Sequence, residues 1–232
     1  MANSKRARDG SHQSSRDRRP TIGLLLDWLE DQYQIAILSG VADAARDSDT
    51  NLVCFVGGRL RSPYRFDAQR NVLYELVGKE NVDGLLILSG AISCDVGLEE
   101  TLAFCERYRP LPMVSIALAL NGIHSITVDN EKGVKDAVVH LIETHNYRRI
   151  AFIRGPEGSP EAELRYSIYR DTLAQYDIPL DPDLVTPGDF QRLAGVEAIE
   201  ILLDLRASEL DAIVAANDNM AIGALETLQA RG

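Results

Sequence analysis

The sequence predicts an α/β protein with parallel β-sheets flanked by helices. Short runs such as residues 22–26 and 84–88 are apolar throughout, which is typical of strands buried on both faces. Stretches with helical spacing separate these runs; in residues 134–142 apolar side chains recur at i, i+3, i+4, i+7 and i+8. This alternation implies a parallel sheet, because each helix carries the chain back to the edge where the next strand begins.

The predicted elements follow one another in a regular order along the chain. Apolar runs predict strands at residues 21–27, 51–56, 84–89, 112–117, 125–128, 149–154, 184–185 and 212–216. Helical spacing predicts helices at residues 33–45, 66–77, 98–108, 134–142, 161–176, 196–205 and 219–228. In such sheets a ligand binds at the carboxyl ends of the strands, so the loops that follow the strands are where functional residues are expected.

The length and composition are those of an ordinary globular protein. A chain of 232 residues corresponds to one large domain or two small ones, with enough residues to bury a core. Hydrophobic residues make up 45% and charged residues 25% of the chain. The net charge of −11 disfavours a broad nucleic-acid interface, which needs a basic face. The apolar runs are far too short to cross a membrane.

Residues 1–20 differ in composition from the rest of the chain. They contain six basic and two acidic residues, and only Met1, Ala2 and Ala7 are apolar, which predicts a disordered basic tail. A solvated leader is favoured over a tail that binds nucleic acid or an anionic surface. The tail lacks the apolar segment of a secretory signal, and three cysteines cannot all pair within the chain. Both observations favour a reducing cytoplasm.

Catalytic and metal-binding groups are sparse in the sequence. His140 and His145 are five residues apart, so we expect them not to share a helix face for a metal. Residues 155–159 contain neither a nucleophile elbow nor the Lys-Ser/Thr ending of a phosphate loop. The sequence therefore predicts no catalytic residue, no metal site and no cofactor, and the protein is not expected to be an enzyme.

Groups suited to binding occur at three successive strand ends. The guanidinium of Arg165 can donate to hydroxyls or a carboxylate, Phe190 offers a flat apolar face, and Asn217 can both donate and accept. Each residue alone has a simpler explanation, as a surface residue, a core aromatic or a helix cap respectively. Their occurrence together favours a small-molecule binding site.

Several ordered motifs resemble the ligand-sensing domain of LacI/GalR-type regulators. The resemblance covers about residues 21–232 and implies the type I periplasmic-binding-protein-like fold, with a ligand held between two α/β lobes. The implied division is a lobe at residues 21–129 and a second lobe at residues 130–232. The motifs are Val128-Asp-Asn-Glu-Lys-Gly133, Arg149-Ile-Ala-Phe-Ile-Arg-Gly155, Arg165-Tyr-Ser-Ile-Tyr-Arg170, Leu184-Val-Thr-Pro-Gly-Asp-Phe190 and Ile213-Val-Ala-Ala-Asn-Asp-Asn-Met-Ala-Ile-Gly223.

The resemblance also implies roles for individual residues. Arg165 corresponds to the arginine that grips the ligand, Phe190 to the aromatic residue that packs on a sugar or base ring, and Asn217 to a polar contact. In the first lobe, Asp31 corresponds to a polar contact and Tyr33 to a stacking aromatic residue. Tyr33 and Phe190 are then expected to enclose a ring from opposite lobes when the lobes close.

Three departures from the family pattern limit these expectations. Ala117 stands where the family often has an acidic ligand contact, which favours a less polar ligand. Residues 1–20 are too polar for a helix-turn-helix, so DNA binding is expected only if a DNA-binding domain is supplied elsewhere. The family continues beyond the helix that follows Asn217, so we expect a C-terminally truncated chain with an incomplete second lobe.

One further resemblance concerns the subgroup of these sensors that lacks a helix-turn-helix. Residues 27–33 and 38–45 are similar to sensors that precede kinase, PAS or diguanylate cyclase modules. In that setting Trp28 lies at the mouth of the cleft, although packing of Trp28 against a neighbouring helix explains it as well.

The function favoured by these observations is a non-catalytic, cytoplasmic sensor of a sugar- or nucleoside-like molecule that acts by lobe closure. The resemblance implies a homodimer and a fused or downstream signalling module, and no contact with a membrane is expected. Two alternatives remain: a LacI-family transcriptional regulator that binds DNA in its own right, and a sugar-binding transport protein.

Overall fold

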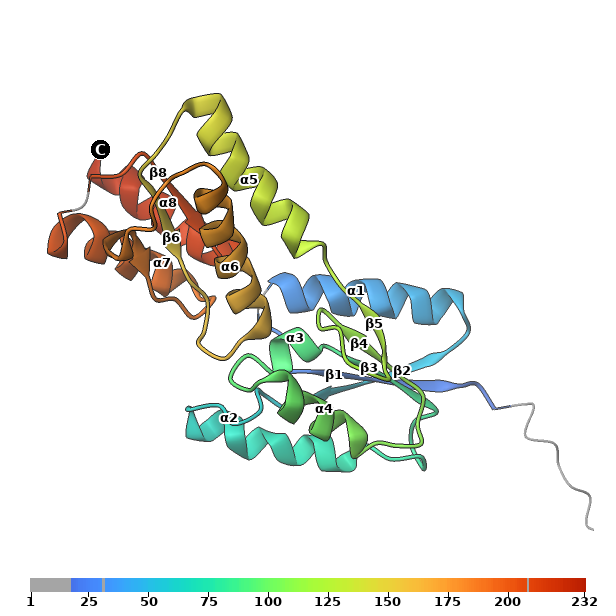
Figure 1. Ribbon diagram of the computed structural model, residues 1–232. Helices are drawn as coiled ribbons and strands as arrows, with labels where there is room; N and C mark the ends of the chain where they lie inside the picture. Colours follow the sequence, from blue (N-terminus) through green and yellow to red (C-terminus); the bar gives the residue numbers. More distant parts are fainter. Residues whose placement is uncertain (1–17, 31, 208) are drawn as a thin grey trace, which may run out of the picture.

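The computed structural model describes residues 18–30, 32–207 and 209–232, and it contains two parallel sheets flanked by helices. The five-stranded sheet has the order β2-β1-β3-β4-β5 and the three-stranded sheet the order β7-β6-β8. Figure 1 shows the two sheets in separate halves of the molecule, which we call the first and the second lobe. The predicted fold class is confirmed.

The bounds of the elements are as follows. The strands are β1 (Thr21–Leu26), β2 (Asn51–Val56), β3 (Gly84–Ile87), β4 (Met113–Ile116), β5 (His124–Ile126), β6 (Ile150–Ile153), β7 (Val185–Thr186) and β8 (Ala212–Ala215). The helices are α1 (Gln32–Asp47), α2 (Arg65–Arg70), α3 (Ser89–Ile92), α4 (Leu98–Glu106), α5 (Asn130–His145), α6 (Pro160–Gln175), α7 (Arg192–Ile199) and α8 (Asp218–Arg231). In the part of the chain that the structure describes, none of these helices is both long enough and apolar enough to cross a bilayer.

The first lobe is a three-layer sandwich because the side chains of each strand alternate between the two faces of the sheet. Leu25 and Phe55 belong to the core on one face, together with Tyr74 and residues of α4. Leu24 and Leu26 belong to the core on the other face, against α1. Since both faces carry apolar side chains, the strands read as continuous apolar runs in the sequence.

Tyr74 fixes the loops that end β1 and β2. Its hydroxyl is buried and donates to the carbonyl oxygens of Leu26 at 3.1 Å and Gly58 at 2.8 Å. The ring occupies the space where a Cβ on Gly57 would stand, so a side chain at that position would displace it. These contacts set the position of the residues that follow β1 and β2, which are part of the site described below.

The second lobe is built around β6, whose four residues are all buried. Phe152 of this strand stacks on Tyr169 of α6 with the ring centroids 4.7 Å apart. On the other face, α7 and α8 approach closely at Gly195 and Gly223, where a Cβ would overlap the backbone oxygens of Met220 and Arg192 respectively. These glycines are therefore required by close packing of the two helices.

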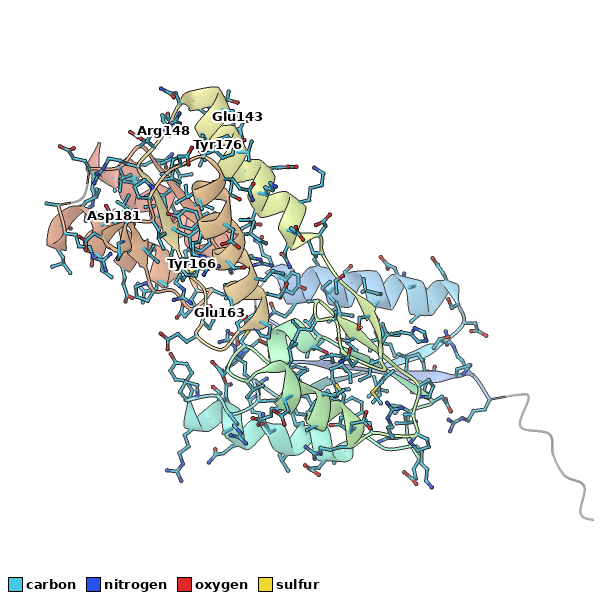
Figure 2. All side chains as sticks on the ribbon, in the orientation of Figure 1. Glu143, Arg148, Glu163, Tyr166, Tyr176 and Asp181 are labelled. Carbon is cyan, nitrogen blue, oxygen red and sulfur yellow. The ribbon has the colours of Figure 1, made fainter. Side chains whose placement is uncertain are left out.

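Helices α5 and α6 are joined by a side-chain contact at the end remote from the first lobe. The Tyr176 hydroxyl donates to Glu143 Oε1 at 2.6 Å, and Figure 2 shows the two residues side by side. Nearer the first lobe, Arg154 pairs with Glu163 of α6 and lies over the ring of Tyr166 at 4.4 Å. The first contact joins α5 to the segment that follows α6, and the second joins α6 to the end of β6.

The elements differ from their prediction in three places. A short helix that was not predicted, α3 (Ser89–Ile92), follows β3 directly. The helix predicted at residues 66–77 is divided into α2 and the 3₁₀-helix Asn71–Leu76. The Asn71 amide donates to the carbonyl oxygens of Gly57 at 2.7 Å and Arg59 at 3.1 Å, so the helix is held against the loop after β2. The helix predicted at residues 196–205 begins earlier, at Arg192, and its last part, Glu200–Leu205, has π-helical hydrogen bonding.

Candidate functional site: a cleft between the lobes

A cavity of about 660 Å³ lies between the two lobes. It is reached from the carboxyl ends of β1 and β8, which is where the parallel sheets predicted a ligand site. Its polar lining comes from both lobes. The charged and amide side chains that line it are Asp27, Gln32, Gln34, Arg59, Glu161, Arg165, Gln191, Asn217, Asp218 and Asn219.

Arg165 lies in this cleft as predicted, and its guanidinium binds three parts of the second lobe. Nε donates to Asn130 Oδ1 at 2.9 Å, one terminal nitrogen donates to the Ala216 carbonyl at 2.7 Å, and the other donates to Glu161 Oε1 at 3.1 Å. Arginine has five N–H donors, so two remain for a ligand. Because its side chain is only 19% exposed, Arg165 is held in a fixed orientation toward the cavity.

Glu161 is a residue of the cleft that the sequence analysis did not single out. Its side chain is 15% exposed, and it lies in the first turn of α6, four residues before Arg165. A Cβ on Gly90 of the first lobe would lie 2.8 Å from Glu161 Oε2 and 2.6 Å from the Ala117 Cβ. The Glu161 carboxylate therefore reaches across the cleft to the first lobe, beside Ala117, where the family pattern led us to expect an acidic group.

Phe190 and Asn217 lie together on the second lobe. The Asn217 amide donates to the Phe190 carbonyl at 2.9 Å, and its Oδ1 accepts from the backbone N–H of Met220 at 3.1 Å. Asn217 thus caps α8 and fixes Phe190, which has a positive φ of 70°. The Phe190 ring fills the space beside Gly155 and lies 6.0 Å from the guanidinium carbon of Arg165.

On the first lobe, Tyr33 lines the cavity and Asp31 lies outside the described residues. Tyr33 is 46% exposed, at the first turn of α1. Partial burial, followed by the carboxylate of Glu161, raises the pKa of the Tyr33 phenol. The phenol therefore lies close enough to the second lobe for the charges of Glu161 and Arg165 to influence its pKa. Trp28 does not line the cavity; its ring packs on the Arg70 guanidinium at 4.4 Å.

A second group of residues that the sequence analysis missed forms the polar floor of the cleft in the first lobe. Asp27 directly follows β1 and is 1% exposed, and Gln34 Nε2 donates to its Oδ1 at 3.1 Å. Arg59 Nε lies 3.8 Å from Asp27 Oδ2, which is too far for a hydrogen bond. Burial is the largest influence on Asp27 and raises the pKa of its carboxyl. The signal in the sequence was a carboxylate directly after an apolar strand.

The expectation that His140 and His145 do not share a helix face is wrong. Nε2 of His140 and Nε2 of His145 lie 3.2 Å apart, because α5 ends at His145 and the last turn brings the two rings together. In the described ranges, no group of three or more His, Cys, Asp or Glu side chains is arranged to hold a metal ion.

Comparison with known proteins agrees with this geometry. A family model described as a periplasmic binding protein-like domain matches residues 138–232. The HTH-type transcriptional regulator AscG of Escherichia coli (strain K12) is 36% identical over 124 residues, which are 53% of this chain and 36% of that protein. The chain spans less than two thirds of the length of the curated relatives it matches.

Solved structures extend the similarity to nearly the whole chain. The transcriptional regulator CelR–cellobiose complex is 29% identical with a TM-score of 0.69, over 92% of this chain and 64% of that chain. A LacI family transcriptional regulator from Mycobacterium smegmatis is 28% identical with a TM-score of 0.72, over 91% of this chain and 73% of that chain. The chain is therefore similar to LacI-family transcriptional regulators over nearly its whole length and shares their periplasmic-binding-protein-like α/β fold, in agreement with the resemblance of its motifs.

Proposed function

We propose that the cleft binds a sugar- or nucleoside-like molecule and that the domain signals this binding by closing its two lobes, without catalysis. The observation that carries the proposal is the cavity itself, which is lined by side chains of both lobes. A ligand that contacts both lobes stabilises the closed arrangement over the open one by the difference in its affinity for the two. The cellobiose named in the CelR complex supports a carbohydrate-like ligand.

In this proposal, each site residue has a distinct role. Tyr33 of the first lobe and Phe190 of the second offer aromatic faces for a ring, and Arg165 donates its two remaining N–H groups to hydroxyls. Asn217 holds Phe190 in place through the Phe190 carbonyl. Asp31 stays a proposed polar contact of the first lobe.

The reactive groups of the cleft favour binding over catalysis. Burial raises the pKa of the Cys94 thiol to about 12, which makes it a poor nucleophile at neutral pH. The one ion pair within hydrogen-bond distance among the described lining residues, Glu161 with Arg165, is engaged in holding the site together. The three free thiols of the chain, Cys54, Cys94 and Cys105, fit a protein that works in the cytoplasm.

We also propose that the domain works as a homodimer within a larger regulator. Four large apolar side chains of α2 and the segment around it are exposed: Tyr64, Phe66, Val72 and Leu76. Large apolar side chains exposed close together in the chain favour a protein–protein interface in this region. DNA binding is expected only through a DNA-binding domain supplied elsewhere, and the fused or downstream signalling module stays part of the proposal.

Thermal-shift measurements test the binding function. We expect cellobiose, glucose, ribose or adenosine to raise the Tm by several degrees, since ligand at 100 times its Kd stabilises a fold by about 2.7 kcal/mol. Arg165→Ala and Tyr33→Ala should remove the shift. Arg170→Ala is the matched control, because Arg170 is an exposed residue of the same helix that pairs with Asp171. A panel that leaves the wild-type Tm unchanged would contradict the proposal, and binding to a DNA duplex by this chain alone would favour the DNA-binding alternative.

A further inference from the structure

The two histidines at the end of α5 face each other through the same ring atom. Nε2 of His140 and Nε2 of His145 lie 3.2 Å apart, and the two ring planes are inclined at 83°. In a neutral imidazole one nitrogen carries a hydrogen and the other a lone pair. Two lone pairs that face each other at this distance repel, so the pair needs a proton or a metal ion between its nitrogens.

Contacts outside the pair hold each ring in place. Nδ1 of His140 lies 3.1 Å from the hydroxyl oxygen of Thr144, one turn further along α5. When Nδ1–H donates to this hydroxyl, the lone pair of His140 is on Nε2, as a metal ligand requires. The ring of His145 stacks on Tyr147 with the centroids 5.2 Å apart, and Tyr147 packs against the core of the second lobe. Both imidazoles are therefore ordered in advance, which lowers the entropic cost of binding an ion.

The spacing of the two nitrogens suits a transition-metal ion. Imidazole nitrogens bind zinc at about 2.0–2.1 Å, so nitrogens 3.2 Å apart subtend an angle of about 100–105° at the ion. This value is close to the tetrahedral angle. Imidazole favours zinc, copper and nickel, whereas magnesium and calcium prefer oxygen ligands. The pair is therefore matched to the first group of ions.

The surroundings leave the pair open to an ion. Both histidines are exposed, so water can fill the coordination positions that the protein does not supply. The charged residues that flank the pair in the chain have partners of their own. Glu143 accepts from the Tyr176 hydroxyl at 2.6 Å, and Arg148 donates to the Tyr147 carbonyl at 3.0 Å. Figure 2 shows Glu143, Arg148 and Tyr176 together at the end of the second lobe that is remote from the first.

We propose that His140 and His145 form a two-histidine site for a divalent transition-metal ion on the second lobe. Each histidine binds the ion through Nε2, Thr144 orients the first imidazole, and Tyr147 supports the second. The site is separate from the cleft, because α5 begins beside the cleft at Asn130 and ends at His145. Metal binding at this place does not depend on which molecule the cleft binds.

Calorimetry with Zn²⁺ and Ni²⁺ tests the site on the full chain, purified without a histidine tag and kept reduced. We expect one ion to bind per chain, and Mg²⁺ not to bind under the same conditions. Loss of a hydrogen bond that supports a ligating histidine costs about tenfold in affinity, which is the effect expected of Thr144→Val. His140→Ala and His145→Ala remove a ligand outright, so each should weaken binding by more than Thr144→Val does.

His124→Ala is the matched control, because His124 is an exposed histidine of the first lobe. It should bind the ions as the wild type does. The three histidines are exposed, so their replacement changes stability little, and circular dichroism checks that each variant is folded.

Two results would overturn the proposal. If the wild-type chain binds neither Zn²⁺ nor Ni²⁺, the two nitrogens share a proton and the pair is only a hydrogen bond. If His140→Ala and His145→Ala bind the ions as tightly as the wild type, the ions bind elsewhere on the chain, for example at a thiol.

Discussion

Glu161 and Arg165 lie one turn apart on α6, and their side chains meet at 3.1 Å inside the cleft. The same Glu161 oxygen accepts from Asn130 Nδ2 at 3.2 Å, so the carboxylate joins the start of α5 to α6. Its other oxygen is directed at Gly90 of the first lobe. One carboxylate therefore connects three segments that border the proposed ligand.

Glu161→Ala tests how much this connection contributes to the stability of the fold. The change leaves Arg165 and Asn130 each with one partner fewer in a partly buried site, so we expect a loss of about 1–3 kcal/mol in the free energy of unfolding. Glu161→Gln keeps an oxygen acceptor and should lose less. Urea unfolding measures both, and Gln175→Ala, at an exposed position of the same helix, is the control. Equal stability of Glu161→Ala and wild type would contradict the role given to this carboxylate.

Tyr74→Phe should destabilise the first lobe although no carbon atom is lost. The change leaves the carbonyl oxygens of Leu26 and Gly58 without their buried donor, which costs about 1–3 kcal/mol. Tyr64→Phe is the matched control: Tyr64 is 69% exposed, and a surface change of this kind stays within about 0.5 kcal/mol. Thermal unfolding should therefore give a lower Tm for Tyr74→Phe than for Tyr64→Phe, and similar Tm values would contradict the expectation.

Gly195→Ala should be strongly destabilising because the new methyl group overlaps the Met220 carbonyl of α8. We expect a loss of about 1–3 kcal/mol or more, since the two helices must separate to make room. Gly133→Ala in α5 is the opposite case, because no atom lies within 4 Å of the added carbon. Alanine favours a helix by about 1 kcal/mol over glycine, so this variant should be more stable than wild type. Chemical unfolding measures whether the unfolding free energy falls in Gly195→Ala and rises in Gly133→Ala.

The carboxyl of Asp27 should give the stability a pH dependence of definite sign. Burial raises the pKa of Asp27 above 3.8, so the folded protein binds this proton more tightly than the unfolded chain. The contribution of the group is therefore greatest below pH 3.8 and is lost as the pH rises through the raised pKa. As the pH rises through this window, we expect the unfolding free energy of the wild type to fall relative to that of Asp27→Asn, which has no carboxyl at this position. A difference that increases with pH would show that the charged form is the favoured one.

The sequence was informative about the fold and about one side of the site. Uninterrupted apolar runs correspond to the strands, because the strands of a covered parallel sheet are buried on both faces. Arg165 and Phe190 were identifiable from the strand ends they follow. Asn217 lies beside them, but its amide is used as a helix cap and as a support for Phe190.

Apart from Tyr33, the first-lobe side of the site could not be predicted from the sequence, for physical reasons. Gln34 is a polar residue in a helix and Arg59 a charged residue in a loop, and both patterns are those of solvated surface. Their burial depends on Tyr74, which holds the loop after β2 close to the end of β1 from a distant point of the chain. In the sequence, Glu161 is an ordinary acidic residue in the first turn of a helix. Only the folded structure shows that its carboxylate lies beside Gly90 of the first lobe.

Asn130 connects the residues that border the cleft to helix α5. It is the first residue of α5, and its side chain holds both members of the Glu161–Arg165 pair. Helix α5 therefore begins at the residues that border the cleft and extends away from them. Its sixteen residues span about 24 Å, so a rotation of about 10° at Asn130 would carry His145 through about 4 Å. A ligand that shifts Asn130 would in this way be detected as a displacement of His145, at the end of α5.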